Sequence, residues 1–153
     1  MKNNLKDGKG ILYFNKNDKF KRKKYEGDFK NDKREGKGIL YWNDGDRYEG
    51  DFKTDKREGK GIMYYDDGSR YEGDWKNNKR EGKGILLYGY NGDRYEGDWK
   101  NDKKEGKGIM YAYNGDRYEG DLKDNKIEGK GIMYYKYGKT KEGNWKNNEF
   151  IGN

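Results

Sequence analysis

Residues 48–70 read YEGDFKTDKREGKGIMYYDDGSR, and this stretch decides the fold because the same 23-residue unit recurs along the chain. Self-similarity at a fixed period is the signature of repeat architectures. A half unit, DGKGILYFNKND, lies near the start of the chain, and another, KEGNWKNNEFIGN, ends it. The other full units start at Tyr25, Tyr71, Tyr95 and Tyr118. The unit that starts at Tyr71 has one additional residue.

The repeats predict one continuous repeat domain rather than a chain of unrelated domains. We expect an N-terminal half repeat with a basic insertion at residues 1–24, five full repeats at 25–140, and a C-terminal half repeat at 141–153. Only 29% of the residues are hydrophobic and 42% are charged, but 16% are aromatic and recur at fixed intervals. Each aromatic side chain can bury roughly 150–250 Å², so stacked repeats can share a core.

Each repeat is too short for two helices and predicts two antiparallel strands. The segments YEGDFK and GKGIMYY alternate as half-buried strands do, and the DDG and NGD segments are hairpin turn signals. The predicted fold class is all-β, a single-layer antiparallel β-hairpin solenoid of 23-residue repeats.

A strand register follows from the turns. A loop at 54–57 would set Gly50 opposite Gly61, Tyr48 opposite Met63, and Phe52 opposite Gly59. A three-residue turn at 66–68, with its glycine in the left-handed region, would set Gly61 opposite Gly73 and Met63 opposite Tyr71. On the other face this register places residues of opposite charge across from each other, which predicts cross-strand ion pairs. A one-residue slip of the register would break every pair. These pairs are Lys53–Glu58, Asp51–Lys60, Glu58–Lys76 and Lys60–Asp74.

The glycines of this register fall in one row, which predicts a trough between two ridges of aromatic and methionine side chains. A partner protein could lie in such a trough, or the same rings could serve only as the core. The candidate groove residues are Tyr48, Phe52, Met63, Tyr71, Trp75, Tyr95, Trp99 and Met110.

The composition argues against catalysis, cofactors and metal sites. There is no His and no Cys, and the lone Ser69 lies in a turn, so nucleophilic triads and histidine acid–base chemistry are excluded. Carboxylates such as Glu49 and Asp51 have lysine neighbours and are expected to form salt bridges. The turn aspartates around Asp44 and Asp66 do not follow the EF-hand spacing and are typical of turn chemistry.

The charge of the chain is concentrated at one end. Residues 1–24 hold nine Lys or Arg against two Asp or Glu, whereas residues 25–153 hold 27 of each. The sharpest feature is an insertion of about five residues where other repeats have a tight turn. It is either a solvated loop, a contact for anionic lipid, or a contact for an acidic protein tail or nucleic acid. Its cations are Lys19, Lys21, Arg22, Lys23 and Lys24.

The pattern Y-E-G-x-W/F-K-x-x-x-x-E-G-K-G closely resembles the MORN (membrane occupation and recognition nexus) repeat, and it recurs in five full repeats and both half repeats. One departure is systematic: where the family has Gly in the loop after the first strand, this chain has Asn or Asp. These residues are the next best for left-handed backbone geometry, so the fold stands. They are Asp32, Asp55, Asn78, Asp102, Asn125 and Asn148.

The resemblance implies an adaptor that holds protein partners, as in membrane, cytoskeletal and ciliary assemblies. We therefore expect a non-catalytic protein-interaction scaffold without cofactors. The alternative is a peripheral membrane module that binds anionic phospholipids through the basic insertion. The neutral array argues against tracking a nucleic-acid backbone.

The ends of the chain give two further expectations. The start MKNNLKDGKG has no apolar segment typical of a secretory signal, so we expect a cytoplasmic protein, membrane-peripheral or associated with the cytoskeleton or cilium. The C-terminal sequence Glu149-Phe150-Ile151 replaces the charged residues of earlier repeats with apolar ones. An exposed strand edge invites pairing, so this edge is predicted to dock a partner or a second copy end to end.

Overall fold

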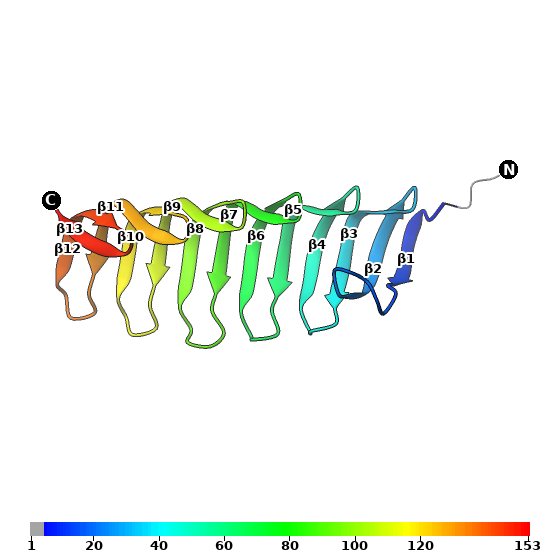
Figure 1. The fold of residues 1–153 in the computed structure, drawn as a ribbon, viewed down its shortest axis with the longest axis horizontal. Helices are drawn as coiled ribbons and strands as arrows, with labels where there is room; N and C mark the ends of the chain where they lie inside the picture. The colour runs from blue at the N-terminus through cyan, green and yellow to red at the C-terminus, as the bar shows by residue number, and fades with distance from the viewer. Residues whose placement is uncertain (1–4) are drawn as a thin grey trace. The chain divides into compact units, whose positions relative to one another are not determined.

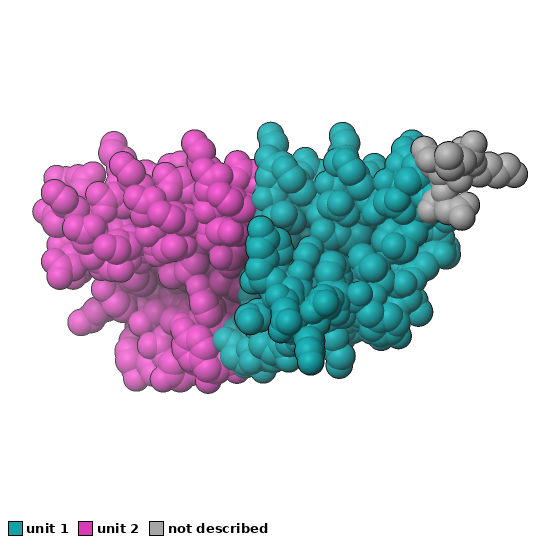
Figure 2. Space-filling view, turned by 45° about the vertical axis from the view of Figure 1, so that its right-hand side comes forward, with its two compact units in different colours: residues 1–78 teal, residues 79–153 magenta. Residues whose placement is uncertain are grey.

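The computed structural model describes residues 5–153, which form two compact units that divide between residues 78 and 79 (Figure 2). Each unit is an antiparallel meander in which strands adjacent in sequence pair with each other (Figure 1). Residues 5–153 contain strands and turns but no helix. The all-β hairpin prediction is therefore confirmed.

The strands of the first unit are β1 (Gly8–Tyr13), β2 (Arg22–Lys30), β3 (Lys33–Trp42), β4 (Arg47–Lys53), β5 (Lys56–Tyr64) and β6 (Arg70–Lys76). The strands of the second unit are β7 (Lys79–Leu87), β8 (Arg94–Lys100), β9 (Lys103–Tyr111), β10 (Arg117–Lys123), β11 (Lys126–Tyr134), β12 (Thr140–Lys146) and β13 (Glu149–Gly152).

The turn between β4 and β5 is shorter than predicted. Thr54 and Asp55 are its two central residues, with φ of 48° and 67°, as in a type I′ turn. Phe52 consequently lies opposite Arg57 rather than Gly59. The predicted Lys53–Glu58 cross-strand pair was wrong, because Lys53 faces Lys56. A type I′ turn matches the right-handed twist of the flanking strands, which favours two residues over four.

A bulge then restores the predicted register. Gly59 has φ of 93°, which other residues rarely adopt, and the pairing shifts between Gly50 and Phe52 of β4. Beyond the bulge, Gly50 lies opposite Gly61 and Tyr48 opposite Met63, as predicted.

The second turn follows the prediction in full. Gly68 has φ of 89°, and the Tyr65 nitrogen donates a 2.9 Å hydrogen bond to the Ser69 carbonyl. Across this turn, β5 and β6 bring Lys60 opposite Asp74 and Gly61 opposite Gly73. The Lys60 ammonium forms the predicted ion pair with the Asp74 carboxylate.

The alternation of side chains gives each hairpin an inner, aromatic face and an outer, charged face. On the inner face Tyr48 is fully buried, and its ring meets Phe52 edge to face at a centroid distance of 5.1 Å. Its hydroxyl donates a 2.8 Å hydrogen bond to the Asp51 carbonyl. Five tyrosines take this fully buried position: Tyr25, Tyr48, Tyr71, Tyr95 and Tyr118.

Candidate partner-binding surfaces

The side chains predicted to wall a groove form the inner core. Seven of them are at most 5% exposed: Tyr48, Phe52, Met63, Tyr71, Trp75, Tyr95 and Trp99. Met110 is half-buried. A partner bound to this face would therefore contact more exposed residues, and the seven buried side chains would only pack beneath that surface.

The predicted trough above the glycine row is closed on the inner face. A Cβ atom at Gly61 would lie 2.3 Å from the Tyr48 hydroxyl oxygen and 2.4 Å from its ring. The same contacts recur at Gly108 with Tyr95 and at Gly131 with Tyr118. Each tyrosine ring therefore fills the space that the missing side chain leaves, which corrects the prediction of an open trough between aromatic ridges.

The glycine row is instead open on the outer face, where it forms the floor of what we call the outer groove. In the first unit this groove encloses about 390 Å³ above Gly50, Gly61 and Gly73. Glu49, Ile62 and Glu72 form one wall and Lys37 and Lys60 the other. The register explains this arrangement, because Ile62 pairs with both glutamates one position beyond the glycine row.

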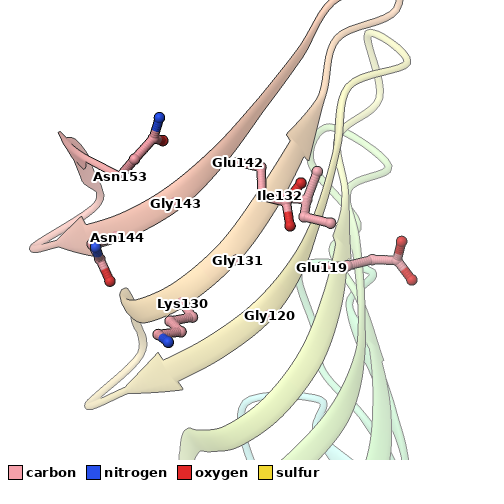
Figure 3. A pocket seen from close by; sticks show the side chains of 9 residues that line it. All are labelled: Glu119, Gly120, Lys130, Gly131, Ile132, Glu142, Gly143, Asn144 and Asn153. Carbon is pink, nitrogen blue, oxygen red and sulfur yellow. The ribbon is translucent and has the colours of Figure 1, made fainter.

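The outer groove of the second unit has the same construction and a volume of about 670 Å³. Figure 3 shows Gly120, Gly131 and Gly143 on neighbouring strands, with Ile132 and Glu142 on one side of the glycine row. Lys130, Asn144 and Asn153 lie on the other side (Figure 3).

Ion pairs fix the lysine wall of the outer groove. The Asp51 carboxylate bonds the Lys37 ammonium and also accepts a 3.0 Å hydrogen bond from the Lys60 backbone nitrogen. Burial raises the pKa of Asp51, but the bonds from Lys37 and Lys60 outweigh it, so that this pKa lies below its usual range. The side chains of Lys37 and Lys60 remain 75% exposed at the rim, where their ammonium groups are paired with Asp51 and Asp74.

Part of the basic insertion belongs to a strand or is hydrogen-bonded to the next repeat. Arg22, Lys23 and Lys24 belong to strand β2, and the Lys21 carbonyl accepts a 2.8 Å hydrogen bond from the Asn43 nitrogen. Figure 1 shows the segment between β1 and β2 folding back beside the neighbouring strands of its unit.

Two of the five cations are engaged in ion pairs. Arg22 donates bidentate hydrogen bonds of 2.9 and 2.7 Å to Asp18, which hold the pKa of that carboxyl well below its usual range. Lys24 pairs with Glu26 at 2.7 Å, which raises the pKa of Lys24. The side chains left exposed are Lys19, Lys21, Lys23 and the neighbouring Phe20.

The C-terminal strand β13 is partly engaged in the core. Phe150 is half-buried, and its ring lies 5.3 Å from that of Trp145. Ile151 is 62% exposed. The apolar side chain exposed at this edge is therefore Ile151 rather than Phe150.

Sequence reasoning missed how the hairpins are tied together. The Glu35 carboxylate accepts a 2.8 Å hydrogen bond from the Thr54 nitrogen in the next repeat. The turn residue Asp55 likewise bonds back to the preceding hairpin, at Arg34. Glu, and Asp or Asn, recur at these positions of the repeat, and this recurrence was the available signal. The sequence does not show which backbone groups they bond, because those groups are brought close only when the hairpins stack.

Residues 5–153 hold no cluster of three His, Cys, Asp or Glu side chains that could ligate a metal ion. The same residues include no helix with the length and apolar character needed to cross a membrane.

Among solved structures, the chain is similar to the SAS-4 (dCPAP) TCP domain of Drosophila melanogaster in complex with a proline-rich motif of Ana2 (dSTIL). The sequence identity is 15% and the TM-score 0.47. The similarity covers 69% of this chain and 56% of that chain. A search of curated proteins finds no match.

Family models give a match over most of the sequence. The MORN repeat model matches residues 1–19, 25–47, 48–70, 71–89, 95–117 and 118–139. Together with the in-phase recurrence of the glycine and aromatic positions, these matches show that the chain belongs to the MORN repeat family.

Proposed function

We propose that this protein is a non-catalytic interaction scaffold that binds an extended segment of a partner protein along the outer groove. The observation that carries the proposal is the recurrence of one groove chemistry in both units. In each of them a glycine floor lies beside an Ile/Glu wall, and the opposite wall is formed by Lys37 and Lys60 in the first unit and by Lys130, Asn144 and Asn153 in the second.

This chemistry suits a polypeptide ligand. The floor of the groove is bare backbone on this side, because a Cβ at a glycine such as Gly61 would point to the inner face, toward Tyr48, so another chain can approach the floor closely. The half-buried Ile39 and Ile62 offer an apolar strip, and the glutamates and lysines beside them can select the charge pattern of the ligand. Such walls favour an extended segment with apolar and charged side chains in alternation.

Site-specific crosslinking tests the proposal. A photo-crosslinking amino acid in place of Ile62 would capture the partner in cells that express the chain, and the captured segment would then be identified and synthesised. The same crosslinker in place of the exposed Lys53, outside the groove, is the control and should not capture it.

The affinity of the purified segment provides the second measurement. We expect Ile39→Arg combined with Ile62→Arg to weaken its binding by at least about tenfold, since buried interface positions do not accept an unpaired charge. Equal capture at both crosslinker positions, or unchanged affinity in the double variant, would contradict the proposal.

A second candidate function is peripheral binding to anionic lipid, and one observation favours it. Phe20 is 55% exposed and is flanked by the exposed Lys19, Lys21 and Lys23. An apolar ring among cations suits a negatively charged membrane surface, where each cation contributes about 1 kcal/mol.

A further inference from the structure

An opening with a volume of about 350 Å³ lies on the inner face of the first unit, and we call it the basic pocket. Leu40 and Trp42 of β3 line it together with residues of the turn between β4 and β5. Leu40 lies opposite the core residue Tyr48, which places the opening on the inner face and away from the outer groove. The basic insertion contributes Phe20 and Arg22 to the same lining.

The side chains around the basic pocket carry an excess of positive charge. Among the described residues that line it, the carboxylate is that of Asp55. Two carboxylates outside the lining bond to it, since Asp18 pairs with Arg22 and Glu35 accepts a hydrogen bond from the Thr54 nitrogen. The lining itself contains four cations: Arg22, Arg34, Lys56 and Arg57. The exposed lysines that neighbour Phe20 and Arg22 in sequence add to this excess: Lys19, Lys21 and Lys23.

The guanidinium groups of the basic pocket differ in the acceptors that they meet. The Arg34 guanidinium donates to the Asp55 carboxylate at 3.2 Å. In the next repeat Asn78 occupies the position of Asp55, so the Arg57 guanidinium donates to an uncharged amide oxygen, at 3.4 Å. Burial, and to a smaller degree the positive charge of Arg22, lower the pKa of Arg34 although Asp55 pairs with it. An anion that entered the pocket would therefore be stabilised by cations that repel one another.

Two aromatic rings lie beside these cations. Phe20 is 55% exposed, and the Arg22 guanidinium lies 4.9 Å from the centre of its ring. Trp42 is half-buried, and the Arg57 guanidinium lies 5.4 Å from its ring. Lys56 is exposed and takes part in no ion pair within residues 5–153. Guanidinium groups bind carboxylates through paired N–H donors, and the rings offer apolar surface next to them.

We propose that the basic pocket binds an acidic segment of a partner polypeptide in which an apolar side chain lies beside the carboxylates. This inference rests on the proposed scaffold function and names a second contact, distinct from the outer groove. The carboxylates would pair with Lys56 and Arg57, and the apolar side chain would pack on Phe20 and Trp42.

The geometry favours a polypeptide over other anionic partners. Arg34 is 8% exposed and Leu40 3%, so the floor of the pocket is reached by a single side chain rather than by a flat membrane surface. A nucleic-acid backbone needs cations spaced along a row of phosphates. Here the cations surround one opening, and residues 25–153 carry no net charge.

Indole NMR tests the basic pocket, because Trp42 belongs to its lining whereas Trp99 and Trp145 belong to the second unit. The probe is the peptide Ac-Asp-Glu-Leu-Glu-Asp-NH2, and Ac-Asn-Gln-Leu-Gln-Asn-NH2 is its uncharged control of the same shape. We expect the acidic peptide to shift the indole N–H signal of Trp42 and to leave those of Trp99 and Trp145 unchanged, and we expect added salt to weaken its binding. Absence of the shift, or an equal shift with the uncharged peptide, overturns the proposal.

A pair of charge reversals locates the binding site. Lys56→Glu places a carboxylate at the pocket, and Lys126→Glu is the matched control, because both lysines are exposed first residues of their strands, β5 and β11. We expect Lys56→Glu to weaken binding of the acidic peptide by at least about tenfold and Lys126→Glu by less than about twofold. Unchanged binding in Lys56→Glu, or an equal loss in the two variants, overturns the proposal.

A variant of the exposed ring tests the apolar contact. Phe20→Ala truncates a side chain that is 55% exposed, so the fold should be retained. Replacing the leucine of the peptide by glycine should weaken binding to the unmodified chain. The same replacement should have a smaller effect on binding to Phe20→Ala, because the ring on which the leucine packs is gone. An equal effect in both proteins overturns the apolar contact.

The outer-groove variant Ile62→Arg separates the two proposals. It should leave the Trp42 shift intact, because Ile62 lines the outer groove and not the basic pocket. A failure of the outer groove would therefore appear in the crosslinking experiment and not in the indole spectrum, whereas loss of the Trp42 shift in Ile62→Arg would overturn the assignment of the peptide to the basic pocket. A Trp42 shift with phosphatidylserine vesicles or an oligothymidylate, but not with the acidic peptide, would assign the pocket to another anion and overturn the proposal.

Discussion

The backbone nitrogen of Arg34 donates a 2.8 Å hydrogen bond to Oδ1 of Asp55, and the Asp55 nitrogen donates a 3.0 Å hydrogen bond back to the Arg34 carbonyl. The buried Arg34 guanidinium also donates to the Asp55 carboxylate and carbonyl, at 3.2 and 2.6 Å. A turn residue of one repeat thus ties down the preceding hairpin. This contact explains why Asp or Asn replaces the family's Gly: glycine supplies the positive φ but no side-chain acceptor.

Replacing Asp55 by Gly should therefore destabilise the fold even though glycine accepts the φ of 67°. We expect Asp55→Gly to lower the free energy of unfolding by about 1–3 kcal/mol, because a buried donor and a buried cation lose their acceptor. Asp55→Asn keeps Oδ1 and is the control, with a smaller loss. Urea unfolding monitored by circular dichroism measures both. Equal stability of the two variants would show that the turn oxygen is dispensable.

The Tyr48 ring over Gly61 predicts a steric cost that depends on the ring. We expect Gly61→Ala to lower the free energy of unfolding by about 1–3 kcal/mol, by overpacking. Gly10→Ala is the matched control at the equivalent position of β1, where a Cβ would lie 3.4 Å from the nearest atom, on the Phe29 ring. Thermal melting of the two variants gives the comparison. A Gly61→Ala melt as high as that of Gly10→Ala would contradict the ring placement.

The buried tyrosines predict alkaline unfolding. Burial raises the pKa of Tyr25 from 10.0 to about 12, and it also raises the pKa values of Tyr48 and Tyr95. The folded-state pKa exceeds the unfolded value, so this contribution to stability is complete below pH 10 and is lost as the pH rises through about 12. Tyrosinate absorbance and circular dichroism recorded against pH should therefore change together in this window. Ionisation of these tyrosines well below pH 10 with the sheet intact would refute it.

The insertion predicts that its cations divide into two classes. Lys19, Lys21 and Lys23 are exposed, so we expect their joint replacement by Glu to leave the melting temperature unchanged within experimental error. Arg22→Glu removes the bidentate pair with Asp18 and should lower it. If the insertion binds lipid, the triple Glu variant should no longer sediment with vesicles containing phosphatidylserine, and added salt should weaken sedimentation of the unmodified chain. Undiminished sedimentation of the triple variant would remove the lipid function.

Much of the fold could be predicted from the 23-residue period. Strict alternation on both sides of Gly50 and Gly61 leaves one set of buried side chains, so the register across the glycine row and the turn ending in Gly68 follow from the sequence alone. The basic insertion could be recognised in the sequence, because no other repeat has a run of cations at this position. The ion pairs of Arg22 and Lys24 could not be predicted from the sequence. Those pairs depend on where Asp18 and Glu26 are brought by the folded chain.

The sequence by itself therefore determined the repeat, the hairpins, and the left-handed turn residues such as Asp55, because these depend on local backbone preferences and on period-two burial. Tertiary structure alone decided the rest. A loop at 54–57 and a two-residue turn followed by a bulge at Gly59 preserve the same alternation, so only strand twist distinguishes them. The pattern places Tyr48 and Gly61 on one face, but ring packing decides that the inner side is closed and the outer side open. Ala112 and Ile127 likewise line one pocket only after the hairpins stack, because they are 15 positions apart in sequence and belong to adjacent repeats.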